Sequence, residues 1–332
     1  MSSFLLVIKN LVTQWKPLPY PTASFAGQTI IVTGANVGLG FEASRHFVRL
    51  GAQKVILACR SVKKGEEARL DIERTTGRKG VCEVWEVDIG DFDSVQAFTK
   101  RVEGLDRVDV VCENAGVAGF EYKPHKSGFD AMTAVNVVGT FLLALNLLPI
   151  LRKSGQRFNM IPRLEITSSG VHSSAKFAEK NEPLIFEALK RNDNPEWIKE
   201  RYPVTKLLEV LGARALVEQM KRGPHANQKV IVNLVNPGFC KSSLARDAKG
   251  FMFIMFTVMK TIMARTTEMG SRTIYAAAAA GEESHGQYMS DCVVVQPSEW
   301  VLSAEGKQTG DRVWNELLDI LEDIQPGISQ NI

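Results

Sequence analysis

Short apolar runs rich in β-branched residues alternate with longer amphipathic segments along most of the chain. The short runs predict strands, because β-branched side chains suit a pleated surface and the runs are too short for typical helices. The expected strands cover residues 29–33, 54–59, 81–87, 108–112, 163–167 and 229–235, with a seventh over 288–295. The expected helices cover residues 38–50, 61–76, 92–103, 127–153 and 203–222. This alternation predicts an α/β fold with one parallel sheet and helices on both faces.

The N-terminal segment, residues 1–25, does not follow this alternation. Apolar residues recur at helical spacing over residues 4–15, which predicts an amphipathic helix, and the proline-containing stretch 16–21 predicts a stiff connector. The uninterrupted apolar run, residues 4–8, is too short to span a bilayer. We expect the helix to dock on the protein's own surface or on a partner subunit. Attachment to a membrane surface is less favoured, because the polar face carries little positive charge.

Composition and charge restrict the partners of the main domain, which is expected over residues 26–325. The chain is 45% hydrophobic and 23% charged, which is typical of a soluble globular protein. A net charge of +3 without a long run of Lys or Arg argues against nucleic-acid binding. The cysteines are widely spaced and the histidines lack metal-binding spacing. We therefore expect reduced, buried thiols, no metal site and a cytoplasmic location.

A glycine-rich turn follows the first expected strand. The stretch TGANVGLG, residues 33–40, places Gly34, Gly38 and Gly40 where that strand joins the first helix. Glycines allow a tight turn and a close approach of backbone N–H groups to a pyrophosphate, and the helix N-terminus favours negative charge. In an alternating α/β chain this turn predicts a dinucleotide site in a single Rossmann-type, doubly wound parallel sheet.

The end of the second expected strand indicates which dinucleotide binds. Sites for NAD place an acidic residue there, which binds the ribose 2′-hydroxyl. Here the strand ends at Cys59 and is followed by Arg60, with no acidic residue. A guanidinium suits a 2′-phosphate, so NADP is the expected cofactor, and an ordinary solvated arginine is the alternative.

Tyr202 and Lys206 lie four positions apart in the stretch RYPVTK, residues 201–206. Four residues make about one helical turn, so the two side chains can share a face. A nearby ammonium lowers the pKa of a phenol, which suits a general acid or base, although such a pair also occurs by chance on ordinary helices. Pro203 suits a first helical position, so we expect a helix to begin or kink there.

Further motifs accompany these two in a fixed order, and together they carry a family resemblance. They read TGANVGLG, VDIGD, ENAG, VNVVGT, ITSSG, YPVTK and NPGFCKS. From about Gly27 to Asp323 the chain resembles a short-chain dehydrogenase/reductase. It is similar to the retinol-dehydrogenase-like branch, and closest to fungal members that act as tailoring enzymes in secondary metabolism.

The resemblance implies a catalytic tetrad of Asn136, Ser169, Tyr202 and Lys206. Tyr202 would be the general acid or base, and Lys206 would lower its pKa while binding the nicotinamide ribose. Ser169 would donate a hydrogen bond to the substrate oxygen, and Asn136 would hold a water that relays protons. Two alternatives stay open: Ser168 could replace Ser169, and Asn136 could only cap a kink in a long helix.

The resemblance also implies a cofactor site assembled from several stretches of the chain. Its expected residues are Gly34, Asn36, Gly38, Leu39, Gly40, Arg60, Asp88, Ile89, Asn114, Ala115, Gly116, Tyr202, Lys206, Pro237, Gly238 and Ser242. Asp88 and Ile89 would lie beside the adenine, and the loop from Pro237 to Ser242 would hold the nicotinamide carboxamide, unless Ser242 is a plain helix N-cap. Glu113 departs from the family pattern, which has an asparagine at that position.

Two segments are expected at the substrate site. The gap between Ser169 and Tyr202 is long for the family, so residues 173–200 are expected as an insertion at the rim. Residues 244–265 are apolar on nearly every side, and the resemblance implies a movable lid there. A subunit contact, a core contact or a membrane-surface contact are the alternatives for that segment.

The expected activity is NADPH-dependent reduction of a ketone or aldehyde on a bulky apolar substrate, as a tailoring step in secondary metabolism. Oxidation of a retinoid-like or steroid-like alcohol with NADP is one alternative. A catalytically silent NADP-binding sensor or scaffold is another, although such proteins usually lack the tyrosine or the lysine that this chain retains. The sequence is also compatible with a homodimer.

Overall fold

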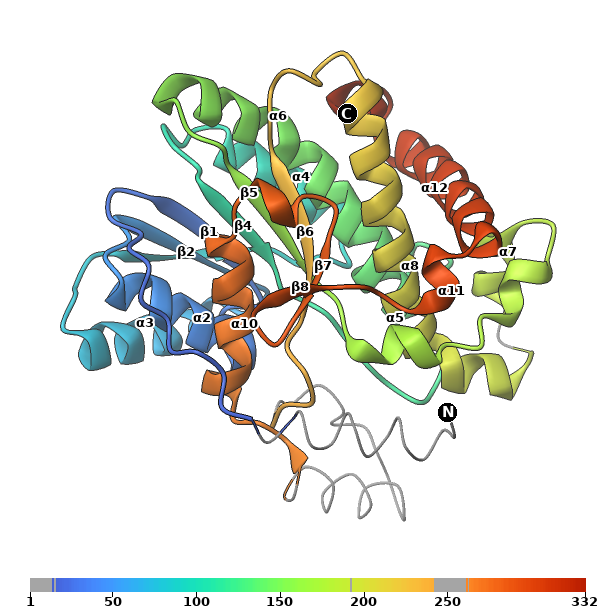
Figure 1. Ribbon diagram of the computed structural model, residues 1–332, viewed down its shortest axis with the longest axis horizontal. Coiled ribbons are helices and arrows are strands. Elements are labelled where there is room, and N and C mark those ends of the chain that lie inside the picture. The colour runs from blue at the N-terminus through green and yellow to red at the C-terminus, as the bar shows by residue number, and fades with distance from the viewer. Residues whose placement is uncertain (1–13, 15, 192, 242–260, 262) are drawn as a thin grey trace.

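One sheet organises the computed structural model, which describes residue 14, residues 16–191, 193–241 and 261, and residues 263–332 (Figure 1). Its strands are β1 (Thr29–Thr33), β2 (Lys54–Cys59), β3 (Cys82–Glu86), β4 (Val110–Glu113), β5 (Arg163–Thr167), β6 (Ile231–Asn236), β7 (Tyr288–Ser290) and β8 (Val293–Val295). Their order is β3-β2-β1-β4-β5-β6-β7-β8, and all neighbours are parallel except β7 and β8. The strand order reverses between β1 and β4, and ligands bind at the carboxyl ends of strands around such a point.

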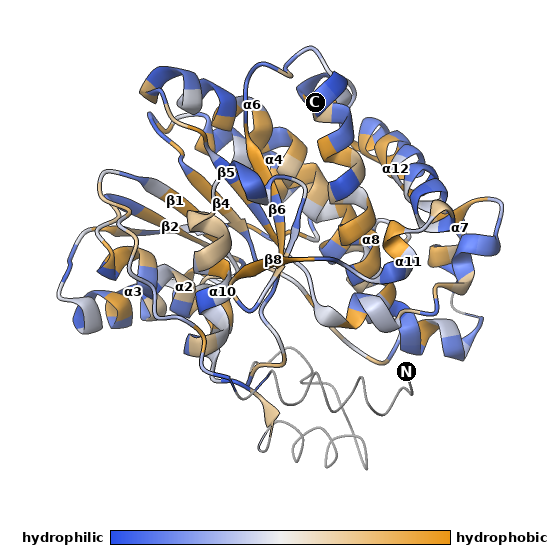
Figure 2. Cartoon of the chain, in the orientation of Figure 1, coloured by the Kyte–Doolittle hydropathy of each residue, from blue (hydrophilic) through white to orange (hydrophobic). Residues whose placement is uncertain are grey.

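Helices cover both faces of this sheet. They are α2 (Gly38–Arg49), α3 (Val62–Thr76), α4 (Phe92–Val102), α5 (Ala131–Thr133), α6 (Thr140–Phe158), α7 (Ile185–Lys190), α8 (Pro195–Arg222), α10 (Thr267–Ala279), α11 (Glu299–Leu302) and α12 (Ala304–Ile324). One face packs against α2, α3 and α10, and the other against α4, α6, α8 and α12. In Figure 2 the strands are largely apolar, and the helices turn polar residues outward. The predicted doubly wound α/β fold is confirmed.

The apolar strands form the core because successive side chains point to opposite faces of the sheet. Ile30 and Val32 of β1 join the layer beneath α2 and α10, whereas Ile31 joins the layer beneath α6 and α8. All three side chains are fully buried. Burying an aliphatic side chain of this size contributes about 1.5–3 kcal/mol, which explains why both faces of these strands are apolar.

The last expected strand, residues 288–295, is two strands. Tyr288–Ser290 and Val293–Val295 pair antiparallel as β7 and β8. Asp291 and Cys292 connect them with φ angles of 53° and 69°, the left-handed region that a two-residue hairpin turn needs. Neither residue is a glycine, and the apolar pattern alone therefore did not reveal the turn.

The helix that carries Tyr202 begins at Pro195, so of the two expectations for Pro203 the helix start is wrong, and the kink stays a prediction. The Asn194 side chain accepts a hydrogen bond from the backbone N–H of Glu196 at 3.0 Å, and Pro195 occupies the first turn. This cap and this proline form a strong start signal, which Pro203 inside the helix does not override.

The expected insertion, residues 173–200, contains α7 and the start of α8. It packs beside α12, where Arg312 Nη1 donates to the Lys180 carbonyl at 2.8 Å and Glu316 Oε2 accepts from the Phe186 N–H at 2.9 Å. The expected N-terminal helix (residues 4–15), apart from Gln14, and most of the expected lid (residues 244–265) lie outside the described residues.

A long apolar helical segment, Ala131–Phe158, crosses the core. It comprises α5, a π-helical turn η1 (Ala134–Gly139) and α6. Its length and composition would suit a membrane span, but most of it is buried inside the protein. The segment is therefore explained as a core helix, and it carries Asn136 toward the carboxyl ends of the strands.

Candidate active site

The glycine turn after β1 is shaped by close contacts that exclude larger residues. Gly34 and Gly38 have φ angles of 65° and 67°, which favour glycine. A Cβ on Gly40 would lie 2.5 Å from Asn114 Nδ2 and 2.7 Å from the Gly34 carbonyl oxygen. Asn36 lies in this turn, and α2 begins at Gly38. The N-terminus of α2 thus opens onto a cradle of the kind that accepts a pyrophosphate.

The turn after β4 joins this cradle to the rest of the site. The Asn114 side chain donates to the Thr33 carbonyl at 2.9 Å, and the Ala115 N–H donates to Thr33 Oγ1 at 2.9 Å. A Cβ on Gly116 would lie 3.3 Å from Asn136 Oδ1 and 3.7 Å from Lys206 Nζ. The expected cofactor residues of β1 and β4 therefore lie directly beside the expected catalytic ones.

Arg60 and Asp88 lie together at the carboxyl ends of β2 and β3. Arg60 Nη1 is 3.8 Å from Asp88 Oδ2, and the Arg60 side chain is 75% exposed. Asp88 Oδ1 also accepts from the Gly90 N–H at 3.0 Å, which holds the turn, and Ile89 beside it is buried. An exposed guanidinium with so loose an ion pair is available to bind a phosphate.

Tyr202 and Lys206 share one face of α8, with Lys206 Nζ 5.9 Å from the centre of the Tyr202 ring. Lys206 is buried and donates to the Thr167 carbonyl at 2.9 Å and to Glu209 Oε1 at 2.7 Å. Burial raises the pKa of Tyr202, and the Lys206 ammonium and a hydrogen bond with Ser169 oppose that rise without cancelling it. Lys206 therefore acts on the pKa of the phenol in the expected direction, but burial outweighs its effect.

The two candidate serines have different surroundings. Ser168 is buried, and its hydroxyl donates to the Lys206 backbone carbonyl at 3.0 Å. Ser169 is the hydroxyl that reaches the Tyr202 phenol, and its side chain also accepts a long hydrogen bond from the Val171 N–H at 3.4 Å. The geometry therefore favours Ser169 as the substrate-facing serine and gives Ser168 a role in holding α8.

Asn136 lies in the π-helical turn and is held on several sides. Its Nδ2 donates to the Val117 carbonyl at 2.9 Å and to Thr205 Oγ1 at 3.1 Å, and its Oδ1 accepts from the Val117 N–H at 2.8 Å. These bonds fasten the segment after β4 to α8 beside Lys206. The water-relay role of Asn136 stays a prediction.

The loop after β6 is organised by Asn236, a residue that the sequence analysis missed. Its Oδ1 accepts from the Gly170 and Gly238 N–H groups, both at 3.0 Å, and thereby joins the expected serine loop to the expected nicotinamide loop. Gly238 has a φ of 77°. Pro237 precedes it in the same loop, and Ser242 lies outside the described residues. A role for Asn236 could have been predicted, because it is the first residue of the NPGFCKS motif.

Other buried charges near the site were not singled out as functional from the sequence. Glu165 and Glu209 are buried carboxylates, and Glu113 was noticed only as a departure from a pattern. Arg201, next to Tyr202, is buried with Asp130 Oδ2 and Glu179 Oε1 each 3.4 Å from its guanidinium. The sequence did offer a signal for Glu165, because a charged residue in the middle of an otherwise apolar strand, as in RLEIT, is unusual.

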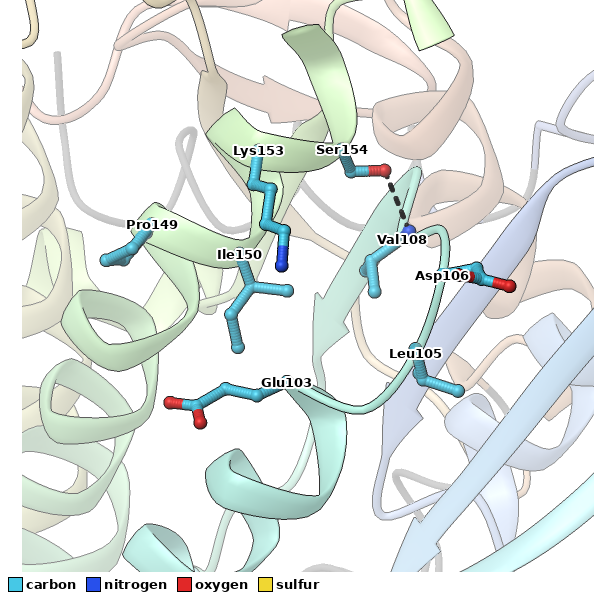
Figure 3. Close-up of a pocket in the computed structure, with 8 residues that line it drawn as sticks. All are labelled: Glu103, Leu105, Asp106, Val108, Pro149, Ile150, Lys153 and Ser154. Carbon is cyan, nitrogen blue, oxygen red and sulfur yellow. Dashed lines mark hydrogen bonds between the residues drawn. The ribbon is translucent and has the colours of Figure 1, made fainter. Parts of the chain in front are cut away.

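A separate cavity of about 170 Å³ lies away from these groups (Figure 3). It is lined by the ends of α4 and α6 and by Val108, whose N–H donates to Ser154 Oγ at 2.9 Å. Val108 precedes β4, so this cavity is at the amino ends of the strands. The candidate active site is at their carboxyl ends, as expected for this sheet order.

Comparisons with known proteins agree with the fold and the motifs. Residues 28–161 match the family model of the short chain dehydrogenases. The chain is 48% identical to the short chain dehydrogenase/reductase dmxR8 of Cryptosporiopsis sp., over 96% of this chain and 97% of that protein. It is 40% identical to the short-chain dehydrogenase anuD of Penicillium roqueforti, over 93% and 81% of the two chains.

Solved structures share the fold at lower identity. A protein from Mycobacterium paratuberculosis aligns with a TM-score of 0.66 and 24% identity, over 91% of this chain and 96% of that one. A short chain dehydrogenase from Escherichia coli, complexed with NADPH, aligns with a TM-score of 0.58 and 23% identity, over 82% and 99% of the two chains. The glycine cradle and the exposed Arg60 of this chain lie at the carboxyl ends of the strands, where dinucleotides bind in sheets of this order. With fungal relatives aligned along nearly its whole length, the protein belongs to the short-chain dehydrogenase/reductase family and is an oxidoreductase.

Proposed function

We propose that this chain reduces a ketone or aldehyde with NADPH. The observation that carries the proposal is the grouping of the Tyr202 phenol, the Ser169 hydroxyl and the Lys206 ammonium at the carboxyl end of the sheet. Bound NADPH would supply the hydride. Tyr202 would donate its proton to the substrate oxygen, and Ser169 would stabilise the negative charge that develops there.

The choice of NADPH rests on Arg60. Its guanidinium is exposed where a 2′-phosphate would lie, and β2 ends without the acidic residue that binds an NAD ribose. Gly34, Gly38 and Gly40 would hold the pyrophosphate, because their turn leaves backbone N–H groups open at the start of α2.

The direction of the reaction is proposed from the cofactor. Cells usually keep the phosphorylated nicotinamide pool reduced, which favours carbonyl reduction over alcohol oxidation. Tyr202 serves this direction as the proton donor, because a phenol with a raised pKa carries its proton at neutral pH.

The substrate is proposed to be bulky and apolar, such as a polyketide, terpenoid or lipid, in a tailoring step of fungal secondary metabolism. The fungal relatives support the biological setting, and the apolar segment 244–265 and the partly exposed Val171 beside Ser169 support an apolar substrate. The retained Tyr202, Lys206, Ser169 and Asn136 speak against a silent sensor or scaffold.

The test is a fluorescence titration with NADPH and NADH, followed by turnover on carbonyl compounds of increasing apolar area. Tighter binding of NADPH and efficiency that rises with apolar area would support the proposal. Preference for NADH would overturn the cofactor assignment. Equal efficiency on small polar aldehydes and large apolar ketones would overturn the substrate class, and cofactor binding without turnover of any compound would favour the silent sensor.

A further inference from the structure

Three buried carboxyl groups lie on β4, β5 and α8, close to the candidate active site. Glu113, at the end of β4, Glu165, in β5, and Glu209, in α8, are all nearly inaccessible to solvent. Within the described part of the chain, both oxygens of Glu113 and one oxygen each of Glu165 and Glu209 lack hydrogen-bond partners. Isolated buried anions are costly, so three carboxylates cannot all be ionised around the single ammonium of Lys206.

The carboxyl groups of Glu113 and Glu165 lie on opposite faces of the sheet. Glu165 lies beside Cys112 in the register of β4 and β5, and Cys112 belongs to the layer beneath α2 and α10. Glu113 lies beside Ile166, which belongs to the opposite layer, beneath α8. Side chains alternate along a strand, so Glu113 shares a face with Glu209 and Lys206, and Glu165 lies across the sheet from them.

Direct contact decides which carboxyl pairs with Lys206. Glu209 Oε1 is 2.7 Å from Lys206 Nζ, in a buried i,i+3 pair on α8. An ammonium has three donor hydrogens, and here two of them bind Glu209 and the Thr167 carbonyl. Gly116 lies beside the same ammonium. Glu209 thus fixes the orientation of Lys206 and leaves one donor for the active site.

Burial raises the pKa of all three carboxyl groups. Burial raises the pKa of Glu209 to about 7, with Lys206 opposing the rise, and raises the pKa of Glu165 to about 8. Burial, with Glu165 and Glu209 nearby, raises the pKa of Glu113 well above its ordinary value. Glu209 alone touches the ammonium, so the attraction of Lys206 favours the ionised form of this carboxyl group most.

We propose that Glu209 is a positioning residue that holds the Lys206 ammonium as its buried counter-ion, while Glu113 remains a neutral carboxylic acid. The proposal rests on the proposed role of Tyr202 as proton donor. A second ionised carboxylate on this face would oppose loss of the phenol proton, as Glu209 already does. Keeping Glu113 neutral limits the negative charge beside Tyr202 to one group.

The groups facing Glu209 come from several elements. Lys206 and Tyr202 lie on α8, Ser168 follows β5, and Glu113 lies at the end of β4. Glu165, in β5, interacts electrostatically with Glu209 from across the sheet. The pKa of Tyr288, in β7, is raised far above its ordinary value, mainly by burial and also by the nearby charge of Glu209. Tyr288 therefore stays neutral, and Glu209 and Lys206 dominate the charge near Tyr202.

Infrared difference spectra of the cofactor-free protein at mildly alkaline pH test the protonation states directly. Glu113→Gln should remove a protonated-carboxyl band, and Glu209→Gln should remove only a carboxylate band. The matched control is Glu218→Gln, because Glu218 pairs with Lys221 at 2.7 Å on the same helix with the same i,i+3 spacing but is exposed. The reverse assignment of the two bands would overturn the proposal.

The pH dependence of kcat/KM tests the consequence for catalysis. Removing the negative charge of Glu209 makes the Tyr202–Lys206 pair lose its first proton at lower pH. The alkaline limb of the Glu209→Gln profile should therefore move down by about one pH unit, the scale of a nearby charge. Glu209→Asp keeps the charge and should restore the limb. A lower kcat with an unmoved limb would show a merely structural role, and a wild-type protein without turnover would contradict the proposed function while leaving the infrared result valid.

Discussion

Gly40 and Asn114 approach each other so closely that no larger side chain fits at position 40. A Cβ there would lie 2.5 Å from Asn114 Nδ2, and the Asn114 amide is itself held by the Thr33 carbonyl. Gly40→Ala should therefore push α2 away from the turn after β4, costing about 1–3 kcal/mol in stability and weakening NADPH binding. Thermal melts and fluorescence titration measure both effects. Gly119→Ala, where the added Cβ meets open space, is the control.

Arg60 should decide the preference between the two nicotinamide dinucleotides. Arg60→Ala should weaken NADPH binding by about 1.5–3 kcal/mol, the scale of a hydrogen bond to a charged group, and leave NADH binding nearly unchanged. Parallel titrations with both dinucleotides measure the difference. Lys79→Ala changes an exposed lysine on the loop before β3 and controls for net charge. Equal weakening of both dinucleotides by the Arg60 variant would contradict a specific role for the guanidinium.

Removing the phenol of Tyr202 should abolish most catalysis without disturbing the fold. Tyr202→Phe keeps the ring but loses the proton donor, so turnover should fall on the order of a hundredfold or more. NADPH affinity should barely change. Steady-state kinetics and a binding titration on the same preparation separate the two effects, and near-normal turnover would exclude Tyr202 as the acid.

The two adjacent serines should give opposite phenotypes. Ser169→Ala removes the hydroxyl beside the Tyr202 phenol and should lower kcat by roughly a hundredfold, as loss of an oxyanion donor does. Ser168→Ala removes a buried bond to the Lys206 carbonyl, which should cost about 0.5–1.5 kcal/mol in stability with a smaller effect on kcat. Denaturant unfolding and kinetics on both variants decide between them, and a larger kcat loss for the Ser168 variant would reverse the assignment.

Glu165 should make the protein less stable as the pH rises. Its pKa is raised from 4.5 to about 8 by burial, so the folded state binds this proton more tightly than the unfolded state does. The corresponding stability is fully present below pH 4.5 and is lost as the pH rises toward about 8. Glu165→Gln should flatten this slope in denaturant unfolding measured across that interval. An unchanged slope would mean that other groups control it.

The sequence predicted the sheet well, because strands such as β1 (TIIVT) and β2 (KVILAC) are short, mainly apolar runs that contain β-branched residues. It predicted the turn at Asp291 and the start of α8 poorly. The hairpin turn contains no glycine, and the cap at Asn194 was obscured by the proline after Tyr202. The pattern of apolar residues therefore predicted strands best where burial of the side chains was the main reason that the strand forms.

For the candidate site, the order of the motifs correctly predicted that the glycine turn, Tyr202 and Lys206 lie at one end of the sheet. It did not predict which groups surround each of these residues. The raised pKa of Tyr202 depends on what surrounds the ring, and the pairing of Lys206 with Glu209 depends on which faces of the sheet and of α8 meet. Such properties arise from packing between distant segments, so no local spacing encodes them.

The π-helical turn at Ala134–Gly139 sets the rotational phase of the long core helix. A π turn accommodates an extra residue, and each residue of an α-helix adds about 100° of rotation. Deleting one residue from this turn would allow a continuous α-helix, but it would rotate Asn136 away from Thr205 or turn the apolar stripe of α6 away from the sheet. The length of this turn is therefore as restrictive as its composition, and chains that differ there by one residue should lose the hydrogen bond that ties Asn136 to Thr205, next to the candidate catalytic Lys206.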